Sequence, residues 1–344
     1  MIQVAGYGAI DAQAPIAPIS FERRDIGPKD ILIDILYCGV CHSDIHMARS
    51  EWGPSVYPIV PGHEIVGKIT QIGSAVSQFK VGEIAGVGVF VDSCRECPSC
   101  KKGQEQYCDE GFTPTYNGYY RDGKTPTFGG YSNQYVVDED YALHIPFTSE
   151  LERVAPLLCA GITTYSPLRY AGVGPGHKVA VLGLGGLGHM AVKFAASFGA
   201  EVTMLSTSPS KEADAKRLGA HHFALSTDKD QMKALRGQFD FILNTVAAKY
   251  DLNKFLDLLT VEGKMLLVGI PPEDNELGSA KLISRRRSII GSNIGGIAET
   301  QEMLDYCAKH NILSDVEEIQ MSEINGAYDR ILKSDVKYRF VIKM

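Results

Sequence analysis

Long apolar runs are missing from this sequence of 344 residues. A membrane-spanning helix needs about 18 or more consecutive apolar residues, and the most apolar segment, 179–190, is interrupted by glycines and a histidine. The opening residues show no basic cluster ahead of an apolar stretch, so we expect no signal peptide. The sequence therefore predicts neither a membrane span nor export, and we expect a cytoplasmic protein.

An excess of positive charge is also lacking. Lys and Arg total 34 and Asp and Glu total 41, which gives a net charge of −7. Nucleic-acid-binding proteins usually carry a basic patch or stripe, and anionic membranes attract polybasic segments. We therefore expect no nucleic-acid or membrane partner. The length allows two domains, and 44% hydrophobic residues can fill a sizeable core.

The eight cysteines are unevenly spaced. In a reducing compartment, clustered thiols bind metal more often than they form disulfides. Cys94, Cys97, Cys100 and Cys108 lie close together, and four thiolates at such spacings satisfy a closed tetrahedral zinc site. An iron–sulfur cluster also uses closely spaced cysteines, but the fourth spacing differs from that motif and no proline follows Cys108. The cluster therefore predicts a structural zinc.

The two halves of the chain have different patterns. In the first about 150 residues, short apolar runs such as 31–37, 65–72 and 84–91 are separated by Gly, Pro and Asp, which indicates a β-rich domain. From about residue 156 strands alternate with helices, which indicates a parallel sheet covered by helices. In this α/β part we expect strands at 177–182, 201–205, 239–246, 264–270 and 289–294, and a helix at 189–200. The last about 45 residues predict a helix at 300–310 and a strand at 339–342.

A glycine loop connects the first strand and helix of the second half. Gly183, Gly185 and Gly188 form a G-x-G-x-x-G pattern in a strand–turn–helix context. The first glycine allows a tight turn, the second lets the backbone approach a pyrophosphate, and the third lets helix and strand pack closely. The N–H groups of the helix N-terminus then face the phosphates. A turn without a ligand is the alternative, and the flanking elements favour a dinucleotide site.

The segment after the second strand reads Ser-Thr-Ser-Pro-Ser-Lys at 206–211. A carboxylate near this point would hold the ribose hydroxyls of NAD, and none occurs between Val202 and Lys211. Hydroxyls and a cation suit a 2′-phosphate, so the segment favours NADP, although an ordinary polar loop is the alternative. The expected contacts come from Ser206, Thr207, Ser208 and Lys211.

Three further segments combine cysteine, histidine and carboxylates: 41–46 (CHSDIH), 61–64 (PGHE) and 158–161 (LCAG). A catalytic zinc keeps three protein ligands and one open position. Two thiolates and one imidazole from these segments would supply such a site. The pattern alone does not select them among the nine histidines and the isolated cysteines.

Together these motifs resemble the zinc-dependent medium-chain alcohol dehydrogenases. Within them the sequence is similar to the cinnamyl alcohol dehydrogenase group, which includes bacterial NADPH-dependent aldehyde reductases. The resemblance covers nearly the whole chain and rests on CHSDIH, YPIVPGHEIVG, the four-cysteine lobe, GGYSNQYVV, APLLCAGITTYSPL, GLGGLGHMAVK and YRFV. It implies a β-rich GroES-like catalytic domain at 1–158 and 298–344, and a doubly wound Rossmann NADP-binding domain at 159–297. It also implies a homodimer formed through the edge of the Rossmann sheet.

The resemblance assigns a role to each residue around a catalytic zinc. The expected metal ligands are Cys41, His63 and Cys159, and Glu64 is the carboxylate beside the site that can approach the metal. Asp44 would hydrogen-bond the ligand histidine and so orient its ring, as carboxylates beside metal sites commonly do. Ser43 would hydrogen-bond the substrate oxygen, and His46 would end a proton relay. With the four-cysteine site, the resemblance implies two zinc ions per chain.

The resemblance also implies residues around the cofactor: Thr163, Gly183, Leu184, Gly185, Gly186, Leu187, Gly188, Thr245, Gly269, Asn293 and Ile294. Two departures concern the substrate pocket. Plant members have a large aromatic residue after the cysteine lobe, which 112–116 does not match, and Asn293 stands where an aromatic residue is usual. Trp52, the only tryptophan, could line the pocket or pack in the core.

The expected activity is zinc-dependent hydride transfer between NADP(H) and primary alcohols or aldehydes, aromatic or aliphatic. A zinc-free reductase of the same fold, acting on quinones or enones, would lack the ligand set. A protein that only binds NADP would have no reason to keep Ser43 and His46 beside a complete set of metal ligands.

Overall fold

The computed structural model describes all 344 residues, and the chain forms two units. The first contains 1–162 and 295–344, and the second contains 163–294. These boundaries lie four residues after and three residues before those expected from the sequence. Residues near the second boundary pack in the first unit, where the Ile297 N–H donates to Glu105 Oε2 at 3.1 Å. As a consequence Cys159 belongs to the same unit as Cys41 and His63.

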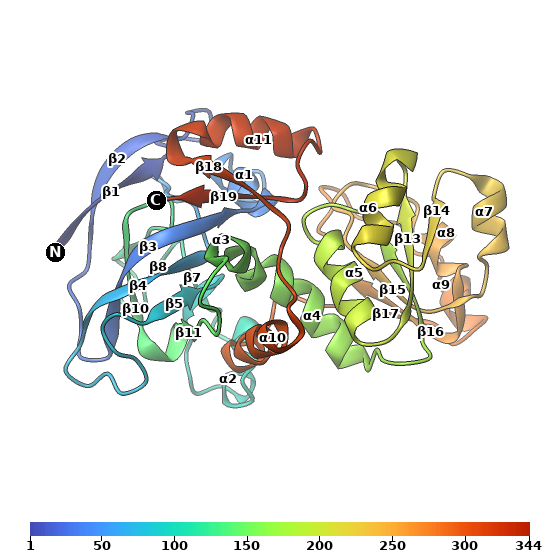
Figure 1. Cartoon of the computed structure of the whole chain (residues 1–344), viewed down its shortest axis with the longest axis horizontal. Helices are drawn as coiled ribbons and strands as arrows, with labels where there is room; N and C mark the ends of the chain where they lie inside the picture. Colours follow the sequence, from blue (N-terminus) through green and yellow to red (C-terminus); the bar gives the residue numbers. More distant parts are fainter. The chain divides into compact units, whose positions relative to one another are not determined.

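The first unit is built around strand β3 (Asp30–Val40). Its isoleucine-rich sequence is buried along most of its length, and it pairs antiparallel with β4 (Ile65–Ile72), β10 (Gln134–Asp138) and β19 (Arg339–Lys343). The sheet has the strand order β11-β5-β4-β3-β19-β18, with β10 added on β3. The C-terminal strand therefore lies beside β3 in the middle of this sheet (Figure 1).

The remaining strands of the first unit are β1 (Ile2–Gly8), β2 (Ala17–Arg23), β5 (Ile84–Val87), β6 (Phe90–Asp92), β7 (Thr113–Pro114), β8 (Gly118–Tyr119), β9 (Pro126–Thr127), β11 (Leu143–His144) and β18 (Val316–Gln320). Its helices are α1 (His42–Ala48), α2 (Pro98–Lys101), α3 (Leu151–Val154), α10 (Ile297–His310) and α11 (Ile324–Leu332), and its 3-10 turns are η1 (Glu105–Tyr107), η2 (Glu139–Tyr141), η3 (Ala155–Leu158) and η5 (Met321–Glu323). Helix α4 (Ala160–Ala171) begins in this unit and continues into the second.

The core of the first unit includes the buried side chains of the neighbouring strands β3, β4 and β19. Ile33, Ile69 and Phe340 are completely buried there, and each such side chain contributes roughly 1.5–3 kcal/mol through the area removed from water. This packing fixes the end of β3 and the start of β4. Cys41 directly follows the last residue of β3, and His63 lies two positions before the first residue of β4.

The second unit contains a six-stranded parallel sheet with the order β14-β13-β12-β15-β16-β17. The chain moves outward in one direction from β12 (Lys178–Leu182) and then in the other from β15 (Phe239–Asn244), as in a doubly wound fold. The expected α/β class, a β-rich GroES-like domain with a Rossmann domain, is confirmed. Dinucleotides bind at the carboxyl ends of such strands, where the order reverses.

The other strands of this unit are β13 (Glu201–Ser206), β14 (His222–Leu225), β16 (Leu259–Leu267) and β17 (Ser288–Gly291). Its other helices, which alternate with the strands (Figure 1), are α5 (Gly188–Ser197), η4 (Pro209–Lys211), α6 (Glu212–Arg217), α7 (Lys229–Ala234), α8 (Leu252–Leu256) and α9 (Ser279–Ile283). None of the chain's helices combines the length and the apolar character needed to cross a membrane.

Candidate functional site

Three segments of the first unit bring a cysteine–histidine–cysteine set together. Cys41 follows β3, His63 precedes β4, and Cys159 follows the 3-10 turn η3. The ligand atoms of these residues and of Glu64 all lie within 4.8 Å of one another. The Cys41 and Cys159 sulfurs are 4.0 Å apart, close to the spacing of about 3.8 Å that two thiolates have at the corners of a zinc tetrahedron with Zn–S bonds of about 2.3 Å. The set therefore fits a zinc ion.

The two thiols of this set are not equivalent. The hydrogen bond between the Cys41 and Cys159 sulfurs lowers the pKa of Cys41 well below its usual value. The same bond, together with burial, raises the pKa of Cys159. The site therefore favours a thiolate at Cys41, which is the form that binds metal.

Asp44 is a completely buried carboxylate that holds this set in place. Its Oδ2 accepts from the Cys41 N–H at 2.8 Å and the Tyr131 hydroxyl at 3.1 Å. Its Oδ1 accepts from the Gly62 N–H at 3.2 Å and from His63 Nδ1 at 3.1 Å. Because Nδ1 is engaged in this way, Nε2 of His63 is the nitrogen that can bind a metal, as is usual for ligand histidines.

Glu64 forms a buried ion pair with Arg339, whose Nη2 donates to Glu64 Oε1. The other carboxylate oxygen, Oε2, is buried and has no hydrogen-bond partner. Burial raises the pKa of Glu64 to about 7, against the opposing charge of Arg339. A carboxylate oxygen left without a partner beside two thiols and an imidazole is a donor that a divalent cation would satisfy.

Helix α1 carries the two residues expected to move a proton. Ser43 is half-buried two positions after Cys41, and His46 lies three positions further along the helix. His46 Nδ1 is 2.5 Å from Glu51 Oε2, and its ring stacks on Trp52 with centroids 4.7 Å apart. Trp52 is 40% exposed, so it is not a core residue, and it lies beside His46 at the surface.

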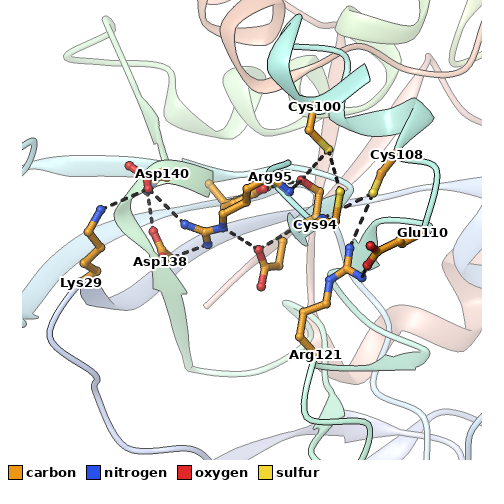
Figure 2. A network of polar contacts seen from close by, with 12 residues as sticks. Lys29, Cys94, Arg95, Cys100, Cys108, Glu110, Arg121, Asp138 and Asp140 are labelled. Carbon is orange, nitrogen blue, oxygen red and sulfur yellow. Dashed lines mark hydrogen bonds and ion pairs between the residues drawn. The ribbon is translucent and has the colours of Figure 1, made fainter. Parts of the chain in front are cut away.

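The four-cysteine lobe forms a second cluster whose sulfurs also lie within 4.8 Å of one another. Cys97 caps α2, and the backbone N–H groups of Cys97 and Cys100 donate to the sulfurs of Cys94 and Cys97 at 3.3 and 3.4 Å. Cys108 follows η1 and accepts from the Cys94 N–H at 3.4 Å. The Cys94 and Cys100 sulfurs are 3.8 Å apart, again the edge of a zinc tetrahedron. Figure 2 shows these sulfurs with the charged residues around them.

The backbone around this lobe favours thiolates. N–H donors from Asp109 and Cys100 lower the pKa of Cys97 to about 6, whereas burial raises the pKa of Cys100 to about 12. The lobe supplies four sulfur ligands, a complete set for a tetrahedral zinc, so it has the composition of a structural site.

The glycine loop of the second unit has the geometry that its sequence predicts. Gly183 has a φ of +91°, a conformation that side chains rarely adopt, and a Cβ on Gly188 would lie 1.9 Å from the Gly183 oxygen. In contrast, a Cβ on Gly185 would meet no protein atom within 4 Å. The fold therefore requires the first and third glycines, while the second leaves open space where a pyrophosphate can approach the backbone.

The hydroxyl-rich segment lies next to this loop. Ser206 ends β13, and its Oγ accepts from the Ser208 N–H at 3.2 Å, while Ser208 and Ser210 share a hydrogen bond of 2.8 Å. Lys211 Nζ donates to the Leu184 carbonyl at 2.7 Å, which connects the segment directly to the glycine loop. Burial lowers the pKa of Lys211. The segment therefore brings a cation and several hydroxyls next to the glycine loop.

The remaining expected cofactor residues lie in the same unit. Thr245 follows β15, and its hydroxyl donates to the Leu182 and Gly183 carbonyls at 2.9 and 3.2 Å. Gly269 follows β16, and a Cβ there would come within 2.3 Å of the Val246 oxygen. Asn293 and Ile294 follow the edge strand β17, and Thr163 is buried within α4.

Three residues around the metal set carried no individual role in the sequence analysis. Arg339 lies 275 positions from its partner Glu64, so no local spacing could connect them. Tyr116 is buried with its ring stacked on that of His63, at a centroid distance of 5.7 Å. Tyr131 is an element of the recognised GGYSNQYVV stretch, but only the fold shows that it hydrogen-bonds Asp44.

The chain belongs to the zinc-binding alcohol dehydrogenase family. Residues 27–147 match the family model for an alcohol dehydrogenase GroES-like domain, and residues 186–309 match that for a zinc-binding dehydrogenase. Within this family, the recognised similarity to the cinnamyl alcohol dehydrogenase group is also found in the solved structures.

Three similar proteins represent that group and its bacterial relatives. The NADP-dependent alcohol dehydrogenase C 1 of Mycolicibacterium smegmatis is 53% identical over 343 residues, covering 99% of this chain and 98% of the relative. The aldehyde reductase YahK of Escherichia coli is 52% identical, with the same coverage. The structure of a cinnamyl alcohol dehydrogenase from Sorghum bicolor, 44% identical, matches with a TM-score of 0.96 over 99% of this chain and 98% of that one.

Proposed function

We propose that the protein is an NADP(H)-dependent, zinc-containing alcohol dehydrogenase and aldehyde reductase that acts on primary alcohols and aldehydes, aromatic or aliphatic. The observation that carries the proposal is the convergence of Cys41, His63 and Cys159 within 4.8 Å, next to Glu64. Three ligands leave a fourth position for a substrate oxygen. The similar proteins whose names include NADP-dependent alcohol dehydrogenase and aldehyde reductase support the same activity.

Two groups that the chain would bind supply the redox chemistry. When bound, the zinc polarises the oxygen of the substrate and the nicotinamide carries the hydride. Cys41, His63 and Cys159 would hold the metal, and Asp44 would fix the His63 ring with Nε2 directed at it. Arg339 holds one oxygen of Glu64, and the other oxygen could approach the metal while no substrate oxygen takes the fourth position.

The proton of the reaction moves through residues of α1. In aldehyde reduction, the Ser43 hydroxyl hydrogen-bonds the substrate oxygen and donates the proton that the new alcohol needs. When the cofactor is bound, its ribose hydroxyls would connect Ser43 to His46. His46 would then exchange the proton with solvent, because its ring is partly exposed and Glu51 lies against its Nδ1. In alcohol oxidation the same groups carry the proton in the opposite direction.

Cofactor selection in this proposal depends on the segment 206–211. The glycine loop would hold the pyrophosphate, and Ser206, Thr207, Ser208 and Lys211 would hold the 2′-phosphate. No carboxylate ends β13, so nothing there would repel that phosphate or hold the ribose of NAD instead.

We also propose a homodimer formed through the edge strand β17. This strand is paired on one side only, and an open strand edge is a template for pairing with another chain. Nearby Ile283 is 80% exposed, which is unusual for so large an apolar side chain. The Ser292 N–H donates to the Leu267 carbonyl of β16, so by alternation the Gly291 N–H faces the open edge. Light scattering on the protein and on Gly291→Pro, which removes that donor, tests this: a dimer that becomes monomeric supports it, and a monomeric wild type refutes it.

A cytoplasmic location is proposed from the thiol chemistry. All eight cysteines are free thiols, and both clusters require reduced sulfur to bind metal. Mass spectrometry of freshly isolated protein with trapped thiols checks this: disulfide-bonded cysteines would contradict the proposal.

The proposed activity is tested with a panel of aldehydes and alcohols, each assayed with NADP(H) and NAD(H), alongside a zinc determination. We expect turnover of primary aldehydes with NADPH by a protein that contains zinc. Activity on quinones or enones that survives complete removal of zinc would instead support a zinc-free reductase of this fold.

A further inference from the structure

A charged residue from a separate hairpin contacts the four-cysteine lobe. Arg121 lies in the loop between β8 and β9, thirteen positions after Cys108, and its Nη2 lies 3.7 Å from Cys108 Sγ. The same nitrogen donates to the Gly111 carbonyl at 2.7 Å, and Nη1 donates to Glu110 Oε2 at 3.3 Å. Figure 2 shows Arg121 reaching Cys108 from the side away from Cys100. The Gly111 carbonyl and the Glu110 carboxylate thus keep the guanidinium next to the Cys108 sulfur.

The other three sulfurs have neutral partners. Cys94 and Cys97 accept from backbone N–H groups, and Cys100 lies 3.1 Å from the Ser93 hydroxyl. The second arginine of the lobe, Arg95, donates its guanidinium hydrogens to three carboxylates, two of which, Asp138 and Asp140, are labelled in Figure 2. Its guanidinium also lies over the ring of Tyr141. The charge of Arg95 is therefore already balanced, and Arg121 is the cation that contacts a sulfur.

We propose that Arg121 is the counter-ion of the lobe's zinc–thiolate cluster and that it makes the lobe retain zinc. Four thiols are neutral, whereas four thiolates around Zn²⁺ carry a net charge of −2, since metal binding displaces the thiol protons. A fixed positive charge against one sulfur stabilises the metal-bound form relative to the metal-free form. The inference rests on the proposed structural zinc but concerns a residue outside its ligand set.

Cys108 is the ligand for which such support matters most. The other three cysteines belong to one short stretch, 94–100, whereas Cys108 directly follows a separate turn, η1. Gly111 lies three residues further along the chain. Arg121 connects this turn to the β8–β9 hairpin through the sulfur and the Gly111 carbonyl. Outer partners of metal ligands typically change metal affinity by about 10- to 100-fold. We expect about tenfold here, the lower end, because the Arg121 side chain is 34% exposed and is shared with Glu110.

The test measures zinc release from the full-length chain. Cys41→Ser and Cys159→Ser together remove two ligands of the other site, so that the zinc retained reports on the lobe. In this parent, Arg121→Gln is compared with Arg121→Lys and with Lys124→Gln, a matched control that removes a positive charge from the same loop. Release is followed with the chelating dye 4-(2-pyridylazo)resorcinol, and thermal unfolding checks that each variant is folded.

We expect Arg121→Gln to release zinc about tenfold faster than the parent, Lys124→Gln to release it at the parent's rate, and Arg121→Lys to fall between them. Equal rates for Arg121→Gln and the parent would overturn the inference. So would equal acceleration by Arg121→Gln and Lys124→Gln, or an Arg121→Lys variant as fast as Arg121→Gln. A parent without zinc refutes the structural site itself, which the wild-type zinc count identifies separately.

A spectroscopic measurement separates a charge on the sulfur from a packing role. In the cobalt-substituted parent, the sulfur-to-cobalt charge-transfer band reports on the electrons of the thiolates. Loss of a cationic donor raises the energy of those electrons, so Arg121→Gln should move the band to longer wavelength, whereas Lys124→Gln should not. An unchanged band in Arg121→Gln would show that Arg121 only supports the loop, and the inference would fail.

Discussion

Replacing Ser206 with Asp provides the most direct test of cofactor selection. Ser206 is the last residue of β13 and is 6% exposed, and β13 lies next to β12, the strand that leads into the glycine loop. A carboxylate at this point would occupy the place where NAD-dependent Rossmann domains hold the ribose hydroxyls. It would also stand close to the site proposed for the 2′-phosphate, within reach of Lys211.

The expected change in kcat/KM follows from two energies, that of the hydrogen bonds to the 2′-phosphate and that of the repulsion by the new carboxylate. Each hydrogen bond from the segment to a charged phosphate contributes roughly 1.5–3 kcal/mol, and about 1.4 kcal/mol corresponds to tenfold in rate. Two such bonds, partly offset by desolvation, give wild type a preference for NADPH of about a hundredfold in kcat/KM. A new carboxylate about 5 Å from the phosphate would repel it by about 3 kcal/mol per unit charge at an effective dielectric constant of about 20. Ser206→Asp should therefore lower kcat/KM with NADPH by about a hundredfold or more and raise it modestly with NADH.

The assay is the initial rate of reduction of one good aldehyde substrate with each cofactor. Ser206→Asn is the matched control, because it has the size of Asp without its charge, and thermal unfolding checks the fold of both variants. We expect the control to lose activity with both cofactors to a similar extent, without reversing their ratio. A wild type that uses NADPH and NADH equally, or a ratio that Ser206→Asp leaves unchanged, would refute the role assigned to this segment.

Three further predictions concern the metal sites and the proton path. Elemental analysis should give two zinc ions per chain, and one zinc, or iron with visible colour, would remove the assignment of one cluster. Cys97→Ser should mainly lower the melting temperature, because a structural site couples metal binding to folding, whereas Cys159→Ser should mainly lower kcat; a Cys97→Ser protein that melts like wild type contradicts the structural role. Ser43→Ala should nearly abolish turnover with zinc still bound, and His46→Gln should cause a smaller, pH-dependent loss, since water can partly replace the distal group. Equal losses that do not vary with pH would exclude the relay.

The features that the sequence predicted well are those determined by neighbouring residues. The buried strand β12 is a continuous apolar run. Of the glycines after it, Gly183 has a positive φ, and Gly188 lies so close to the Gly183 carbonyl that no side chain would fit. The four-cysteine lobe is similar, because its four ligands all lie within the fifteen residues 94–108 and its backbone N–H groups donate to its own sulfurs. Strand limits were less accurate: β16 begins at Leu259, five residues before the expected start, because Leu259 already pairs with Phe239 of β15.

The features that the sequence could not predict depend on strand pairing between distant segments. The pairing of β19 with β3 places Arg339 beside Glu64, and no pattern near either residue indicates the pair. Trp52 had two possible locations, and its stacking on His46 at the surface is decided by the loop after α1. The stretch 112–116 does not match the aromatic position of plant members in sequence, but its last residue, Tyr116, lies with its ring against that of His63 in the fold.

Asp44 shows why the fold and the proposed chemistry of the first unit are difficult to separate. Helix α1 has only seven residues, and helices this short are unstable in isolation. Asp44 caps it by accepting from the Cys41 N–H, and its other oxygen accepts from His63 Nδ1. The same carboxylate thus fixes the helix that carries Ser43 and His46 and the orientation of the ligand imidazole. Because its four acceptor positions are all used and it is completely buried, any loss of one partner leaves a buried charge less compensated. The metal ligands and the proton-transfer residues therefore form one cooperative unit, in which the geometry of each part depends on the folding of the other.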